Sequence, residues 1–275
     1  MLSCRPVTVN DPVRSVDLIR VDGDNRRELS DRVAVEEALE VRLGGHPFAV
    51  IMRTPGDDRN LAAGFLFSEG VLRTPADLAS VDVDASAAVV DVTLSAGRAP
   101  ILEDLLGSRR NVTMNSSCGM CGRRTLESLD VPGEPLDVTW QMPGRLVAAL
   151  PGVLAPAQRA FAETGGLHAA GLVHTDGRLE RSAEDVGRHN AIDKLVGHML
   201  LTGRLPLAGH AMVVSGRLSF EIVQKAWLAG VPMVVAVSAP STLAIDLAAR
   251  TGLTLVGFTR AGRFNIYAGA GRVGP

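Results

Sequence analysis

Two cysteines separated by two residues are the feature of this sequence most able to do chemistry. Cys118 and Cys121 enclose Gly119-Met120, and no acidic residue occurs between Asp104 and Glu127. Positively charged neighbours favour the thiolate form of cysteine, which is the nucleophile and the metal ligand. The pair therefore indicates a reactive sulfur centre, and its aperiodic surroundings predict an exposed loop. The arginines that flank the pair are Arg109, Arg110, Arg123 and Arg124.

The spacing of the cysteines leaves several kinds of site open. A structural zinc site needs four ligands, and Cys4 alone cannot complete one, although two subunits could share a four-cysteine site across a dimer axis. A thioredoxin-like dithiol usually follows a strand in a βαβ unit, and nothing before Asn115 resembles that strand. Two surface cysteines without a function are the remaining interpretation, which the placement of two of only three cysteines in this spacing disfavours.

Length and charge limit the class of protein. The 275 residues suffice for one large domain or for two unequal domains that share a core. A hydrophobic share of 46% and a charged share of 21% are ordinary for a globular protein. The net charge of −2 gives no general attraction to nucleic acid or to an anionic membrane. We therefore expect no nucleic-acid partner, and any anion site must be local.

The sequence predicts a cytoplasmic protein that does not insert into membranes. No apolar run approaches the roughly 18 to 20 residues that cross a bilayer, and the run 231–237 suits a buried strand instead. The first residues lack an apolar core followed by a cleavage site, so we expect no signal peptide. Three cysteines, an odd number, argue against a disulfide framework and for a reducing compartment.

The first 134 residues predict a small α+β unit between a flexible arm and the cysteine loop. Residues 1–30 are polar and contain turn signals such as Asp22-Gly23-Asp24-Asn25, which predicts a loosely ordered N-terminal arm. Residues 31–106 form the small unit, and residues 107–134 form the cysteine loop and a linker. Within the unit the patterns predict a hairpin over 33–53, a helix over 60–69, strands over 81–94 and a brief helix over 101–106.

Residues 135–275 predict an α/β domain. Two helices over 144–150 and 158–163 and a strand over 169–173 precede a helix whose apolar stripe covers 191–200. Strands and helices then alternate, which predicts a mainly parallel sheet covered on both faces. The expected elements are strand 211–215, helix 219–229, strand 231–237, helix 241–250 and strands 253–258 and 264–268.

Three turns of this domain indicate an anion site. Ser215-Gly216-Arg217 and Ser238-Ala239-Pro240 follow two strands and lead into helices, and Arg260 and Arg263 follow a third strand. Ligands of open α/β sheets bind beyond the carboxyl ends of the strands, where helix N-termini attract anions. After Asp246 the chain has no acidic residue, and arginine suits bidentate contacts to phosphate. The pattern predicts a nucleotide site at this edge of the sheet.

The cysteine loop and several other motifs resemble those of one protein family. The run Ser116-Ser117-Cys118-Gly119-Met120-Cys121-Gly122 is similar to the signature loop of the formate dehydrogenase accessory sulfurtransferase family. The resemblance covers most of the chain from residue 33 onward and keeps the motifs in order. The further motifs occupy residues 60–66, 68–70, 165–170, 184–194, 215–221, 238–242 and 257–263.

The resemblance implies a fold and a function. It implies an α/β fold in which a three-layer, cytidine-deaminase-like C-terminal domain adjoins the smaller α+β N-terminal unit. It implies that a cysteine desulfurase donates a persulfide sulfur to Cys118, with Cys121 assisting or receiving it. The recipient would be the molybdenum of the bis(molybdopterin guanine dinucleotide) cofactor, bound as cargo for formate dehydrogenase. A homodimer is implied as well, and we expect no zinc and no other metal.

The family's cofactor-binding stretch corresponds to residues 258–263, which overlap the anion site predicted from the turns. Two other functions stay open. One is a chaperone that binds the cofactor without moving sulfur, and the other is a redox or zinc-sharing dimer built on the cysteine pair. The expected cofactor-binding residues are Ser215, Gly216, Arg217, Ser219, Ser238, Phe258, Thr259, Arg260, Ala261, Gly262 and Arg263.

Histidines and charged residues within the motifs have roles that the sequence leaves open. Zinc-dependent nucleobase deamination needs His-x-Glu and then Pro-Cys-x-x-Cys, whereas Ala170 follows His168 at the Glu position and Ser117 precedes Cys118. We therefore expect no such activity, and His168 and His189 are each more often explained as structural. In one interpretation of a further polar cluster, Asp185 caps the next helix and Asp193 and Lys194 are solvated. In the other interpretation, the cluster positions the cofactor or shapes the dimer. Its members are Asp185, Arg188, His189, Asp193 and Lys194.

Overall fold

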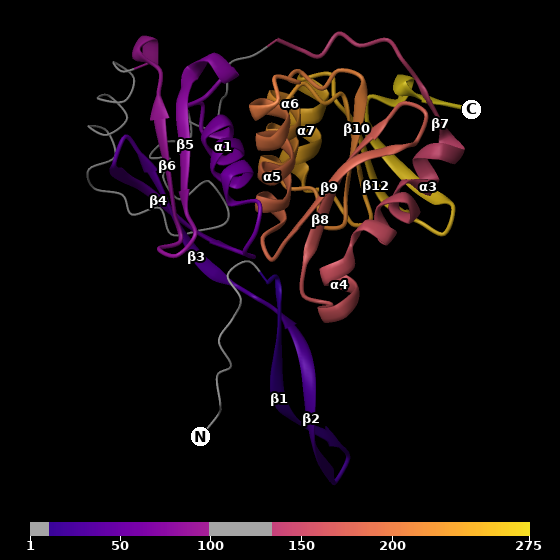
Figure 1. The fold of residues 1–275 in the computed structure, drawn as a ribbon. Coiled ribbons are helices and arrows are strands. Elements are labelled where there is room, and N and C mark those ends of the chain that lie inside the picture. Colours follow the sequence, from indigo (N-terminus) through magenta and orange to yellow (C-terminus); the bar gives the residue numbers. More distant parts are fainter. Residues whose placement is uncertain (1–10, 99–133) are drawn as a thin grey trace.

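The computed structural model describes residues 11–98 and 134–275, and its fold is mixed α/β. Figure 1 shows a smaller N-terminal sheet beside a larger sheet, with helices between the two sheets and around the larger one. The helix predicted over 101–106 and the cysteine loop with Cys118 and Cys121 lie outside the described residues. Within the described part of the chain, no helix is long and apolar enough to cross a membrane.

The predicted hairpin, helix and strands of the N-terminal unit are confirmed. A Gly44-Gly45 turn with positive φ at both residues joins the hairpin strands, and Leu39, Val41 and Leu43 alternate into the core with no exposed surface. The strand order of this sheet is β4-β3-β6-β5, and α1 covers its inner face. Its elements are β3 (Glu37–Leu43), β4 (His46–Arg53), α1 (Asp58–Ser68), β5 (Leu78–Asp84) and β6 (Val89–Leu94).

Residues 13–34 differ from the loosely ordered arm predicted for residues 1–30. They form β1 (Val13–Asp22) and β2 (Asn25–Ala34), an antiparallel ribbon that projects from the body of the molecule in Figure 1. Gly23 supplies the positive φ, 59°, that the turn requires. Most side chains of the ribbon are exposed, and a ribbon that buries little surface leaves only a weak hydrophobic pattern in its sequence.

The larger sheet has six strands in the order β13-β12-β11-β10-β8-β9, and helices cover both faces, as predicted. Helices α5, α6 and α7 pack on one face, and α3 packs on the other. The elements are β7 (Met142–Pro143), α3 (Gly144–Leu154), α4 (Arg159–Thr164), β8 (His168–His174), β9 (Leu179–Asp185), α5 (Arg188–Leu201), β10 (His210–Val214), α6 (Phe220–Leu228), β11 (Met233–Ala236), α7 (Thr242–Arg250), β12 (Thr254–Arg260), β13 (Arg263–Ala268) and β14 (Val273–Gly274).

The expectation of a mainly parallel sheet is wrong. Only β10, β11 and β12 are parallel, whereas β8, β9 and β13 run antiparallel to their neighbours. Helical crossovers join the three parallel strands, while tight turns join β8 to β9 and β12 to β13, and a tight turn can join only antiparallel strands. The sequence did not predict β9, because Ala183 is its only buried apolar residue and gives no alternating pattern.

Helix α1 of the N-terminal unit packs against α5 of the larger unit, and two glycines allow the close approach of the two helices. A Cβ atom on Gly64 would lie 1.9 Å from the backbone oxygen of Asp193, and one on Gly197 would lie 1.9 Å from that of Asn60. Any side chain at either glycine would therefore force the helices apart. This contact brings the charged residues of α5 next to the N-terminal unit.

Candidate functional site

The parallel strands β10, β11 and β12 end together, and we call residues 215–219, 238–240 and 258–263 the carboxyl edge. Backbone hydrogen bonds join its loops: Leu218 forms a bridge with Pro240, and the amide of Phe258 donates to Ser238 O at 3.1 Å. The hydroxyl of Ser215 accepts a hydrogen bond of 2.9 Å from the amide of Ala169 in β8. The structure thus brings the predicted cofactor-binding residues together on three neighbouring loops.

A pocket of about 350 Å³ opens at the carboxyl edge. Arg260 and Arg263 line it, face each other across the β12–β13 turn and are both exposed. Phe258, Phe264 and Asn265 complete the lining. Guanidinium groups beside aromatic rings suit a ligand that combines phosphate with a flat ring. Within the described ranges, neither arginine has a carboxylate partner.

Backbone strain occurs at the same turn. Phe258 has φ of 54° and Ala261 has φ of 50°, a left-handed conformation that costs a residue with a side chain ~1–2 kcal/mol. The side chain of Phe258 is 38% exposed, in a stretch where the β12–β13 register is irregular. The neighbouring Thr259 is buried, and its Oγ1 has no hydrogen-bond partner among the described residues. Strain that holds an aromatic ring at a pocket is typical of ligand-binding turns.

His168 lies beside the carboxyl edge at the start of β8. A Cβ atom on Gly216 would lie 3.4 Å from its Nδ1, so the ring is in contact with the loop after β10. Burial lowers the pKa of His168, and the positive charges of Arg188 and Arg217 lower it further. The imidazole is therefore neutral at pH 7, and the arginines carry the positive charge of this part of the edge.

Glu221 is a residue of this region that sequence reasoning did not single out. It lies in the first turn of α6, where Oε2 is 3.8 Å from Nε2 of His189, and Ser219 Oγ lies 3.4 Å from the same nitrogen. Burial alone would raise the pKa of Glu221, but the interactions with His189 and Ser219 outweigh it and lower the pKa to about 2. An acidic residue in the first turn of a helix is the signal that could have identified it.

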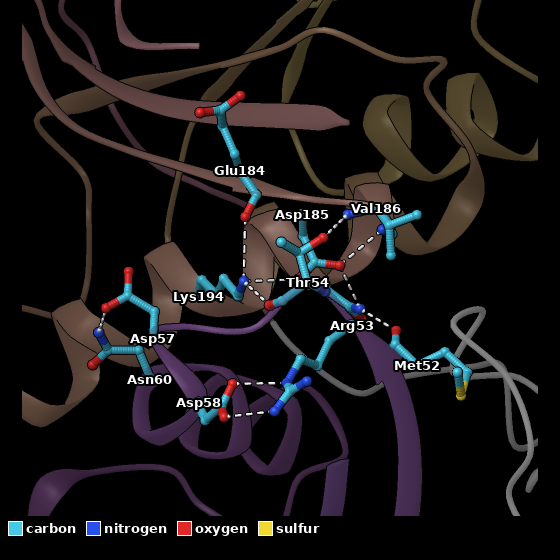
Figure 2. Close-up of polar contacts among 12 residues, drawn as sticks. Met52, Arg53, Thr54, Asp57, Asp58, Asn60, Glu184, Asp185, Val186 and Lys194 are labelled. Carbon is cyan, nitrogen blue, oxygen red and sulfur yellow. Dashed lines mark hydrogen bonds and ion pairs between the residues drawn. The ribbon is translucent and has the colours of Figure 1, made fainter. Parts of the chain in front are cut away.

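Asp185 and Lys194 lie at the interface with the N-terminal unit (Figure 2), and Asp185 is also the register partner of His168. Asp185 has no exposed surface, and its Oδ2 accepts a 3.1 Å hydrogen bond from the amide of Thr54. Nζ of Lys194 lies 2.8 Å from the same oxygen and donates to Thr54 O at 2.9 Å. Gly187, and not Asp185, is the N-cap residue of α5, so the predicted capping role of Asp185 is wrong. The reason is that Asp185 ends the unpredicted strand β9.

Asp193 is also buried and paired. Nζ of Lys225 lies 2.6 Å and 2.8 Å from the two carboxylate oxygens, and the hydroxyl of Ser68 donates to Oδ1 at 2.9 Å. These contacts join α1, α5 and α6. The interpretation of Asp193 and Lys194 as solvated residues is therefore wrong, because both side chains lie where α1 and the loop after β4 cover α5.

The 184–194 motif thus contributes to two places. Arg188 and His189 adjoin the carboxyl edge, where the Cδ of Arg188 would lie 3.7 Å from a Cβ on Gly216. Asp185, Asp193 and Lys194 contact the N-terminal unit, whereas the carboxylate of Glu184 accepts hydrogen bonds from the first amides of α4. Cys118 and Cys121 lie outside the described residues, so their predicted role stays a prediction.

Comparisons with known proteins give one consistent likeness. A family model described as the FdhD/NarQ family matches residues 34–274 of this chain. A protein of Streptomyces coelicolor named sulfur carrier protein FdhD is 51% identical over 261 residues, which cover 88% of this chain and 89% of that relative. One from Anaeromyxobacter dehalogenans with the same name is 47% identical and covers 91% of each chain. A crystal structure described as a formate dehydrogenase accessory protein from Desulfotalea psychrophila has a TM-score of 0.77 at 25% identity and covers 96% of this chain and 100% of that one.

Proposed function

This chain belongs to the FdhD/NarQ family, and from that premise we propose that it carries sulfur from a cysteine desulfurase to a molybdenum cofactor. Cys118 takes the sulfur as a persulfide. The recipient is the molybdenum of bis(molybdopterin guanine dinucleotide), which the protein holds as cargo before the cofactor enters formate dehydrogenase. The names of the relatives, sulfur carrier protein and formate dehydrogenase accessory protein, support this assignment.

The observation that carries the proposal is the cationic pocket at the carboxyl edge. Arg260 and Arg263 line it without a carboxylate partner among the described residues, beside the exposed ring of Phe258. The cofactor carries pyrophosphates and guanine rings, which match guanidinium groups and an aromatic face respectively. Arg217 adds a further positive charge on the loop after β10. The N-termini of α6 and α7 adjoin this edge and favour an anion there.

Loading of the carrier is a thiol exchange. The thiolate of Cys118 attacks the terminal sulfur of the desulfurase persulfide, and a new S–S bond forms on Cys118. The S–S bond on the desulfurase breaks, and the desulfurase cysteine leaves as a thiolate. The step requires no external oxidant or reductant. The flanking arginines assist it, because they favour the thiolate form of Cys118.

Delivery requires two electrons, because the terminal sulfur of a persulfide must become sulfide when molybdenum binds it. The thiolate of Cys121 attacks the inner sulfur on Cys118, and a Cys118–Cys121 disulfide forms. The terminal sulfur leaves with the bonding electron pair as hydrosulfide. It would replace an oxygen ligand of the metal, and that oxygen would leave as water after taking up the hydrosulfide proton and one proton from solvent. A cellular thiol reductant then returns the disulfide to the dithiol. The proposal therefore includes a reducing, cytoplasmic location, and we further propose a homodimer.

A reconstitution experiment tests the proposal. The persulfide-loaded protein is mixed with the cofactor and with formate dehydrogenase that lacks it, and formate oxidation is measured. Wild-type protein is expected to activate the enzyme, whereas Cys118→Ala is expected to bind guanosine diphosphate normally and fail to activate it. Equal activation by Cys118→Ala would contradict sulfur transfer.

A cofactor chaperone without sulfur transfer is the second candidate. The pocket favours it to the extent that, among the described residues, its cationic and aromatic lining comes from β12 and β13. In that case activation would depend on Arg263 and would survive the loss of Cys118. A redox or zinc-sharing dimer would instead give a dithiol potential or a stoichiometric metal, without any need for the cofactor.

A further inference from the structure

A second polar cluster lies at the opposite edge of the larger sheet. His210 begins β10, whereas the carboxyl edge follows the other end of that strand. Its register partner is His174, the last residue of β8, and Glu180 lies in β9 on the other side of β8. The three residues therefore come from three adjacent strands, which hold side chains more rigidly than loops do.

The three side chains converge on one point. Oε2 of Glu180 lies 2.6 Å from Nε2 of His210 and 3.0 Å from Nε2 of His174. The two imidazole rings are 4.7 Å apart between centroids. Among the described residues, this is the one group of three His, Cys, Asp or Glu side chains whose ligand atoms all lie within 4.8 Å of one another.

This donor set has the composition of a metal site. Two imidazole nitrogens and one carboxylate oxygen are ligands of zinc and of similar divalent ions, at distances of about 2.0–2.2 Å. Tetrahedral ligation at such distances separates the ligand atoms by about 3.3 Å. The two Glu180–histidine separations, 2.6 Å and 3.0 Å, are shorter than this, so side-chain rotations would open the space for an ion.

Arg204 orients the carboxylate. It forms an ion pair with Oε1 of Glu180, which leaves Oε2 directed at the two histidines. Burial alone would raise the pKa of Glu180, but the interactions with Arg204 and His210 outweigh it and lower the pKa, so the group is ionised. Groups outside the ligand set that fix a ligand in this way are typical of metal sites.

We propose that His174, Glu180 and His210 bind one divalent transition-metal ion such as zinc, with Arg204 as a positioning residue. The side chain of His174 is 28% exposed and that of Arg204 is 46% exposed, so water can supply a further ligand. The site differs from the expectation of no metal. That expectation followed from the incomplete cysteine ligand set and the missing deaminase motif, and it did not consider these three residues.

The site is expected to bind its ion with moderate affinity. Nδ1 of His210 is buried and has no hydrogen-bond partner among the described residues. Ligating histidines usually donate that second N–H to an acceptor, and loss of such an acceptor costs ~10–100-fold in affinity. We therefore expect binding weaker than that of a closed structural zinc site.

Calorimetric titration of the full chain with Zn²⁺ tests the proposal. Cys4, Cys118 and Cys121 are first replaced by Ser, so that thiolates cannot bind the metal. The parent protein is expected to bind one equivalent and to show a raised melting temperature. His174→Ala and His210→Ala are each expected to weaken binding by at least ~10-fold. Co²⁺ in place of Zn²⁺ gives an independent readout, because its visible spectrum reports the coordination geometry.

His198→Ala is the matched control. His198 belongs to the last turn of α5, and its pKa is lowered mainly by burial and then by Arg181. The charges of Arg204 and Glu180 also act on it, but it is not one of the three residues whose ligand atoms converge. Its replacement is expected to leave Zn²⁺ binding unchanged. The proposal would be overturned if the folded parent bound no Zn²⁺, or if His174→Ala and His210→Ala bound Zn²⁺ as tightly as the parent does. The cluster would then be an ion pair only.

Discussion

The interface between the two units and the carboxyl edge of the larger sheet both gather charged residues, but they pair them differently. At the interface each buried cation contacts a carboxylate: Lys194 with Asp185, Lys225 with Asp193, and Arg53 with Asp58. At the carboxyl edge, Arg217, Arg260 and Arg263 are exposed and have no carboxylate partner within the described residues. One set of charges is satisfied by the fold, and the other is available to a ligand.

The difference separates structural charge from functional charge. A buried ion pair adds little net stability over an apolar replacement, but removal of one partner leaves a buried charge and is costly. An exposed arginine contributes little to folding, and its removal affects mainly the anion that it binds. Variants in the two regions should therefore affect different measurements.

Asp193→Ala should have the largest effect, because Lys225 would remain buried without its counter-ion and Ser68 would lose its acceptor. We expect the free energy of unfolding to fall by about 3–5 kcal/mol, measured by chemical denaturation. Asp246→Ala, which removes an exposed carboxylate of α7, is the control and should change little. An unchanged stability of Asp193→Ala would contradict the structural role of the interface.

Arg263→Ala should behave in the opposite way. We expect guanosine diphosphate to bind ~10-fold more weakly, which corresponds to about 1.4 kcal/mol, while the free energy of unfolding stays nearly constant. Calorimetry gives the affinity, and Arg145→Ala, an exposed arginine of α3, is the control. If both variants bind the nucleotide equally well, the carboxyl edge is not the nucleotide site.

Glu221→Gln tests the carboxylate in the first turn of α6, which contacts His189 beside the carboxyl edge. Because the folded pKa of about 2 lies below the ordinary value of 4.5, the carboxylate stabilises the protein above pH 4.5, and this contribution is lost as the pH falls toward 2. The variant should be less stable than wild type at pH 7, by less than about 1 kcal/mol because the group is partly solvated. Chemical denaturation of wild type and variant at pH 7 and at pH 3 should therefore show a smaller difference in the free energy of unfolding at pH 3. A difference that grows at pH 3 would contradict this assignment.

Ala261→Gly should change the stability only slightly. Glycine relieves the strain of a φ of 50°, so we expect a gain of about 0.5 kcal/mol. The same change loosens the turn that carries Arg260 and Arg263, and nucleotide affinity should fall several-fold. Ala88→Gly is matched, because Ala88 has φ of 52° in the N-terminal unit and should gain stability without any change in affinity. Equal affinity in the two variants would show that the strained turn serves no binding role.

Local sequence patterns predicted most elements and the turns that meet at the carboxyl edge, whose role as a nucleotide site stays a prediction. Hydrophobic periodicity and turn residues are local properties, so they identified the α1 and α5 helices, the parallel strands and the loops that contain Ser215 and Ser238. They failed for β9 and for the β1–β2 ribbon, which bury few apolar side chains.

The partners of the charged residues could not be predicted in the same way. The contact between Thr54 and Asp185 joins residues 131 positions apart, and that between Ser68 and Asp193 spans 125. A sequence-only interpretation left Asp193 and Lys194 either solvated or functional, because only the α1–α5 packing reveals their burial. The cluster of His174, Glu180 and His210 was missed for the same reason, since three strands bring it together.

The central claim is that Cys118 carries sulfur, and intact-protein mass tests it most directly. The protein is incubated with an active cysteine desulfurase and cysteine, and wild type is compared with Cys118→Ala. The account predicts a gain of one sulfur atom that a reductant removes and that the variant lacks. No gain in wild type, with the desulfurase active in the same tube, would contradict the account.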